Sequence, residues 1–117
     1  MINLSLDRDV LDALVGFMEE DRETFVPVRL SILVYLYFTH RAQFTHLQTK
    51  LNLTSGNLSS HIRKLQDLGL VKVSKHFVDL KPTTIVSITT DGVEKVRSQL
   101  LRMRELVSAA ILRDPEE

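Results

Sequence analysis

Two short amphipathic helices joined by a tight turn, and followed at once by strands, constrain the fold of this chain most. The spacing of Thr45 and Gln48 matches a capping box and predicts a short helix that ends near Leu51. A second helix is predicted over Ser55–Leu68, with Thr54 as its N-cap. Its apolar residues recur at helical spacing: Leu58, Ile62, Leu65 and Leu68. Two helices separated by about three residues predict a helix-turn-helix.

After Gly69 the hydrophobic period changes from that of a helix to that of a strand. Residues 71–74 alternate valine with polar residues, and residues 84–89 are β-branched at nearly every position. The intervening Asp79-Leu80-Lys81-Pro82 predicts the turn of a hairpin. Residues 89–92 are typical of the start of a helix, so a last helix is expected to follow the hairpin.

Two more helices are predicted before this motif. The first runs from about residue 7 to residue 20, because its apolar residues follow helical spacing. The next begins at Pro27 and is apolar nearly all round, which predicts the buried central helix of the domain. Its aromatic residues are accordingly expected in the core: Tyr35, Tyr37 and Phe38.

The first and last helices carry apolar stripes that one small core has little means to cover. In the last helix the apolar positions alternate in steps of three and four, the pattern of a coiled-coil seam. A second copy of the chain is the simplest partner that could cover these stripes, so we expect a homodimer. Its predicted interface comprises Val10, Leu11, Leu14, Met18, Val96, Leu100, Met103, Val107 and Ala110.

Composition excludes several classes of protein. The 117 residues contain no cysteine, which excludes disulfides, thiolate zinc sites and a cysteine nucleophile. We find no leader pattern and no apolar run near the ~20 residues of a membrane span, so a cytoplasmic protein without membrane association is expected. The four histidines lack ligand spacing, and no phosphate-binding loop or nucleophile motif is present. We therefore predict no metal, no cofactor and no enzymatic activity.

The charge is distributed unevenly, although 15 basic residues balance 15 acidic ones. Residues 1–24 carry seven acidic and two basic side chains, whereas residues 41–81 carry seven basic and two acidic ones. A basic middle between acidic or neutral ends is typical of a segment that binds a polyanion.

The stretch FTHLQTKLNLTSGNLSSHIRKLQDLGLVKVSK resembles prokaryotic winged-helix transcriptional regulators of the broad MarR-like and ArsR-like type. The resemblance covers roughly residues 26–112. It implies a mainly α fold with a small β-hairpin (α+β): a winged helix-turn-helix with N-terminal and long C-terminal dimerisation helices. Residues 1–117 would then form one domain: an N-terminal helix (1–24), the helix-turn-helix and wing (26–89), and a dimerisation helix (90–113). The turn of the wing departs from the family in having Asp79 and Leu80 where glycine and arginine are usual, so entry of the wing into a minor groove stays open.

The second helix of the motif leaves small polar and basic residues outside its buried stripe. Such side chains let a helix enter the major groove, where asparagine can bind adenine edges and serine can bind bases or phosphates. The alternative is an ordinary solvated helix face. The residues expected to contact DNA are Thr45, Thr54, Ser55, Gly56, Asn57, Ser59, Ser60, His61, Arg63, Lys64, Lys75, Lys81 and Thr83.

The leading hypothesis is therefore sequence-specific binding of double-stranded DNA by a homodimeric transcriptional regulator. A winged-helix protein-protein interaction module is the alternative, because a fold does not determine a function. That alternative requires apolar anchors on the second helix of the motif, and Ser55–Ser60 is small and polar except for Leu58. Whether a small-molecule effector exists is left open.

Overall fold

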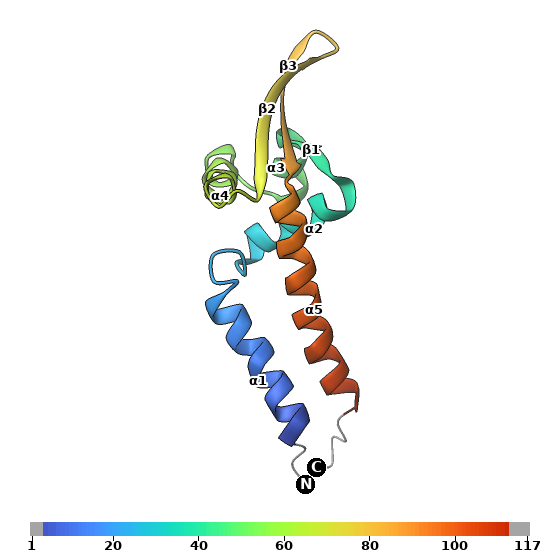
Figure 1. Ribbon diagram of the computed structural model, residues 1–117. Coiled ribbons are helices and arrows are strands. Elements are labelled where there is room, and N and C mark those ends of the chain that lie inside the picture. Colours follow the sequence, from blue (N-terminus) through green and yellow to red (C-terminus); the bar gives the residue numbers. More distant parts are fainter. Residues whose placement is uncertain (1–3, 113–117) are drawn as a thin grey trace. The chain divides into compact units, whose positions relative to one another are not determined.

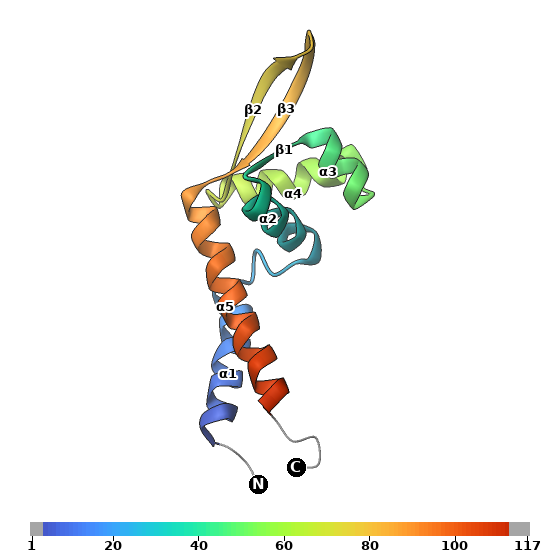
Figure 2. The same cartoon turned by 90° about the vertical axis from the view of Figure 1, so that its right-hand side faces the viewer.

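The structure is a computed structural model that describes residues 4–112 (Figures 1 and 2). In chain order it contains α1 (Leu4–Glu19), α2 (Pro27–Thr39), β1 (Arg41–Gln43), α3 (Phe44–Leu51), α4 (Ser55–Asp67), β2 (Val71–Val78), β3 (Lys81–Ile88) and α5 (Thr90–Leu112). The predicted winged helix-turn-helix class is confirmed. The chain divides into two compact units, residues 26–96 and residues 1–25 with 97–117.

The core of residues 26–96 lies where α2, α4 and the sheet meet. From α2, Ile32, Leu33 and Leu36 are fully buried, together with Leu58 of α4 and Val86 of β3. The prediction that α2 supplies the centre of the domain is confirmed. A helix that is apolar on every side does not indicate which of its faces will be buried. In the structure, the buried residues of α2 are Ile32, Leu33 and Leu36.

The prediction that the aromatic cluster of α2 is core was wrong. Phe38 is 71% exposed and Tyr35 is 40% exposed, while Tyr37 is half-buried. The physical reason is that the small core is already filled by the aliphatic face of α2. The Tyr35 hydroxyl instead forms a hydrogen bond with Nε2 of His46 on α3, at 3.1 Å.

The start of α3 also differs from its prediction. The helix begins at Phe44 with Gln43 as its N-cap and no capping side chain, so Thr45 is not the N-cap. The cause is β1, a strand that the sequence analysis missed. Because Ala42 pairs with Val86 and Gln43 with Ile85, the chain is held in the sheet as far as Gln43 and turns directly into α3.

The ends of α4 follow the local signals in the sequence. Thr54 caps the helix, since its hydroxyl oxygen accepts a hydrogen bond from the Asn57 backbone N–H at 3.1 Å. Gly69 follows the helix with φ = 76°, the left-handed conformation that glycine adopts without steric cost. The predicted Ser55–Leu68 and the observed Ser55–Asp67 differ by one residue.

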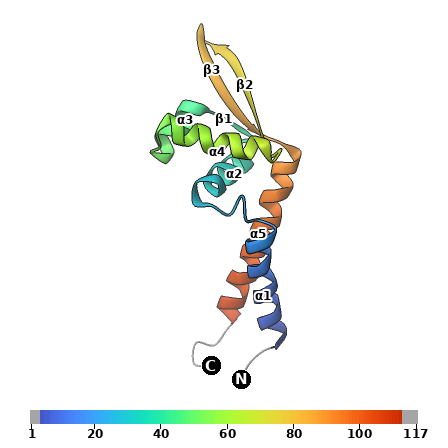
Figure 3. The same cartoon turned by 90° about the vertical axis from the view of Figure 1, so that its left-hand side faces the viewer.

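The sheet is antiparallel in the order β1-β3-β2, which adds a third strand to the predicted hairpin (Figure 3). Val78 pairs with Lys81, so only Asp79 and Leu80 form the turn between β2 and β3. Their φ angles are 51° and 67°, and two left-handed residues in a two-residue loop are typical of a type I′ hairpin. Strand β3 therefore begins earlier than predicted.

A buried polar network joins α1 to α5 inside the unit formed by residues 1–25 and 97–117. Asp21 is fully buried and accepts a hydrogen bond from Arg102 at 2.8 Å, and Arg102 also pairs with Glu20. Gln99, also fully buried, donates to the Thr24 hydroxyl. No local sequence pattern predicts this network, because its partners lie far apart in the chain.

Gly92 provides a test of the junction between the hairpin and α5. A Cβ at this position would lie 2.3 Å from the Leu70 carbonyl oxygen, a backbone atom that cannot move aside cheaply. We expect Gly92→Ala to lower the free energy of unfolding by about 1–3 kcal/mol, the usual cost of overpacking. Gly56→Ala is the matched control, because a Cβ there meets nothing within 4 Å. Equal denaturation midpoints for the two variants would contradict this account.

No helix within residues 4–112 is both long enough and apolar enough to cross a membrane.

Candidate nucleic-acid interface

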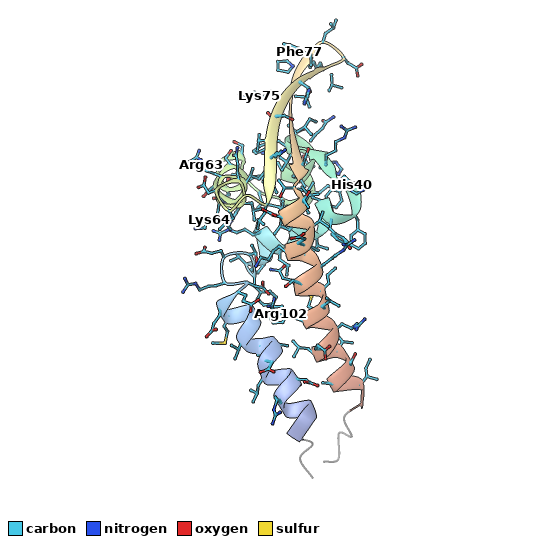
Figure 4. All side chains as sticks on the ribbon, in the orientation of Figure 1. His40, Arg63, Lys64, Lys75, Phe77 and Arg102 are labelled. Carbon is cyan, nitrogen blue, oxygen red and sulfur yellow. The ribbon has the colours of Figure 1, made fainter. Side chains whose placement is uncertain are left out.

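Helix α4 separates its side chains into a core face and a polar face. Leu58, Ile62 and Leu65 are buried. The predicted DNA-contacting residues of this helix lie outside that face: Ser55, Gly56, Asn57, Ser60 and Arg63 are exposed, and Ser59, His61 and Lys64 are half-buried. Figure 4 shows α4 end-on with Arg63 and Lys64 labelled. The helix therefore presents hydrogen-bonding and basic groups without losing its packing, and we name it the recognition helix after the DNA contact expected of it.

The first turn of the recognition helix is small and carries no acidic residue. The backbone N–H groups of a first turn have no partner within the helix, and together with the helix dipole they favour an anion. A Cβ added at Gly56 would meet nothing within 4 Å. Close contact with the preceding helix therefore does not explain why a glycine stands at this position. Small, uncharged side chains in the first turn leave room for a phosphate backbone to approach these N–H groups.

Arg29 of α2 lies against the recognition helix and forms a hydrogen bond with His61. Its Nε donates to Nδ1 of His61 at 3.3 Å. Since an arginine N–H can only donate, Nδ1 acts as the acceptor and the ring hydrogen of a neutral His61 lies on Nε2. His61 thus keeps one N–H donor for a ligand. Arg29 was not among the predicted site residues. Its one signal in the sequence is that it is the single charged residue of a mostly apolar helix.

The hairpin distributes its basic residues over two faces. Lys75 pairs with Thr84 and Lys81 pairs with Val78, and side chains of paired residues share a face. Because Lys75 is at an odd and Val78 at an even position of the same strand, Lys75 and Lys81 lie on opposite faces of the hairpin. Both are exposed, and Thr83 is half-buried. Thr45 is exposed on α3 and Thr54 is exposed at the cap of α4.

The family described as winged helix DNA-binding domain matches residues 28–107 of this sequence. The chain belongs to this family. An uncharacterised protein of Methanocaldococcus jannaschii is 35% identical over 79 residues, which cover 68% of this chain and 86% of the relative. The expected membership of a winged-helix DNA-binding family is confirmed.

Solved structures share the winged-helix fold. A transcriptional regulator homologue from Pyrococcus horikoshii is 37% identical, covers 86% of this chain and 99% of its own, and superimposes with a TM-score of 0.78. A variant of Staphylococcus aureus MepR bound to an oligodeoxyribonucleotide is 18% identical, with a TM-score of 0.69 over 94% of this chain and 79% of that one. At that identity the likeness concerns the fold alone.

The predicted dimer residues of this winged-helix protein differ in exposure. Val96 is fully buried within its own chain and is therefore not available to a second copy. Val10, Leu100 and Met103 are half-buried. The remaining five are exposed: Leu11, Leu14, Met18, Val107 and Ala110. Leu101 and Ile111, also exposed, extend the apolar surface of α5.

Within the residues that the structure describes, no group of three or more histidine, cysteine, aspartate or glutamate side chains could hold a metal ion.

Proposed function

We propose that this chain is a homodimeric transcriptional regulator that binds double-stranded DNA sequence-specifically. The observation that carries the proposal is the recognition helix, whose exposed face is built from small polar and basic side chains and has no acidic residue before Asp67. Membership of a family of DNA-binding domains supports it. The protein-interaction alternative needs apolar anchors on this face, and its exposed positions through Arg63 are polar.

Each part of the recognition helix has its own role in the proposed complex. Asn57 is suited to the N6 and N7 atoms of adenine, and the serines of the first two turns to base edges or phosphates. The Nε2–H of His61 is a further donor. Arg63 and Lys64 come later in the helix and would contact phosphate, which positions the helix without selecting a sequence.

The dimer would bring two recognition helices to one DNA duplex. Apolar side chains on α1 and α5 that remain exposed in a single chain support this step, among them Leu11, Met18 and Val107. A twofold dimer would contact half-sites about 34 Å apart, one turn of B-DNA, so its operator should be pseudo-palindromic.

Replacing Asn57 and Arg63 together by alanine tests the recognition helix. We expect the dissociation constant for a DNA fragment selected by the wild-type protein to rise about 100-fold or more, because a base contact contributes about 1–3 kcal/mol and the dimer would lose the Asn57 contact in both half-sites. The cap of α4 should persist, since Thr54 binds the backbone of Asn57 and not its side chain.

Gln66→Ala is the control, because Gln66 is exposed near the end of the same helix. Its DNA affinity should equal that of the wild type. An unchanged affinity of the double variant, with an unchanged melting temperature, would refute the assignment of α4 as the recognition helix.

A further inference from the structure

The tip of the β2–β3 hairpin exposes apolar side chains that no described residue covers. Phe77 is 79% exposed, Leu80 is 94% exposed and Val78 is 40% exposed. Pro82 is also exposed, and it pairs with Phe77 across the strands. Figure 4 shows Lys75 and Phe77 on the outer part of this hairpin. We name Phe77, Val78, Leu80 and Pro82 the wing tip.

The turn inside the wing tip is made from residues that suit it poorly. Both central positions have positive φ, where asparagine and glycine are preferred. Asp79 tolerates this conformation, but for leucine it costs about 1–2 kcal/mol. Leu80 thus combines backbone strain with an apolar side chain that is 94% exposed. Strain of this kind is concentrated at sites of function, which indicates that the Leu80 side chain has a partner.

The charges around the wing tip favour a polyanion as that partner. Lys75 and Lys81 flank it, with Asp79 as the single acidic residue of the hairpin. The lysines lie on opposite faces, as the strand register shows. A minor groove has a phosphate row on each side and is about 6 Å wide. A hairpin lying edge-on in that groove would direct one lysine towards each row.

We propose that the wing tip enters the minor groove as an apolar wedge. Phe77 and Leu80 contact sugars and base steps, and Lys75 and Lys81 bind phosphates of the two strands. Lys75 and Phe77 share a face two residues apart, about 6.6 Å along the strand, so both can reach the groove wall at once. Apolar wedges of this type unstack base steps and bend the duplex. The proposal rests on the DNA binding proposed above. In it, apolar contacts take the place of the contact that an arginine at the wing turn would make.

The test is the double variant Phe77→Thr with Leu80→Gly. Threonine favours strands and glycine favours the left-handed turn, so the hairpin should be retained. The probe is a wild-type-selected duplex of about 30 base pairs, which spans two half-sites and their flanks. We expect the dissociation constant to rise about tenfold and end-to-end fluorescence transfer to report a smaller bend. The dependence of affinity on salt should stay unchanged, because apolar contacts release no counterions.

Phe38→Thr is the matched control, because Phe38 is a comparably exposed phenylalanine on α2. The DNA affinity of this variant should equal that of the wild type. Unaltered affinity of the wing-tip variant would overturn the wedge and assign the tip to a protein partner. A loss of affinity with a shallower salt dependence would also overturn it, because the lysines would then be displaced. If the wild type itself does not bind duplex DNA, the proposed function fails and the wedge fails with it.

Discussion

A chain that carries Leu11→Glu and Val107→Glu is expected to sediment as a monomer and to bind DNA about 10²–10⁴-fold more weakly than the wild type. Both side chains are more than half exposed in the single chain, so the changes leave the monomer's own packing intact. Each glutamate would be buried twice in a twofold interface, where an uncompensated charge is costly. A monomer then contacts one half-site and loses the gain in affinity from joining two binding modules.

The control receives the same two charges at exposed polar positions, Ser31→Glu with Thr90→Glu. It should sediment like the wild type in analytical ultracentrifugation. A Leu11/Val107 variant that stays dimeric would place the dimer interface elsewhere, and a monomer with full DNA affinity would show that dimerisation is not required for binding.

Arg102→Met is expected to lower the free energy of unfolding by about 3–5 kcal/mol, the effect of removing one partner from a buried ion pair. The reason is Asp21, whose fully buried carboxylate loses its guanidinium partner at 2.8 Å. The pair with Glu20 adds little, since the Glu20 side chain is 67% exposed. Native-state hydrogen exchange should show the amide protons of α1 exchanging faster, because Arg102 joins its C-terminal end to α5.

Arg104→Met is the control, since Arg104 is exposed two residues further along α5. The free energy of unfolding of Arg102→Lys should fall between those of Arg102→Met and Arg104→Met. An ammonium group keeps the charge but lacks the planar fork that reaches several acceptors. If Arg102→Met and Arg104→Met show the same stability, the network does not hold α1 against α5.

Local signals explain why the recognition helix could be predicted almost to the residue. Thr54 binds the backbone three residues on, and Gly69 supplies the left-handed residue after the helix, so both ends are specified by neighbours in sequence. The polar face also follows from the positions of Leu58, Ile62 and Leu65. The residues proposed to contact DNA from this helix, and the dimer, remain predictions.

Non-local pairing explains most of what the sequence analysis missed. Strand β1 is three residues long and exists because it pairs with β3, about 45 residues further along the chain. Arg29 meets His61 across 32 positions and Arg102 meets Asp21 across 81. No periodicity in a short window contains such a pair. The exposed aromatic residues of α2 were mispredicted for a related reason, since only the tertiary packing selects which face of that helix is buried.

Fluorescence anisotropy of the wild-type protein with selected and random duplex DNA, from 50 to 200 mM salt, tests the central proposal most directly. If the dimer contacts about six to ten phosphates, its affinity should fall about 10³–10⁵-fold across this range, with selected fragments bound far more tightly than random ones. Weak binding to every duplex with little dependence on salt would contradict the account and favour a winged helix that binds a protein.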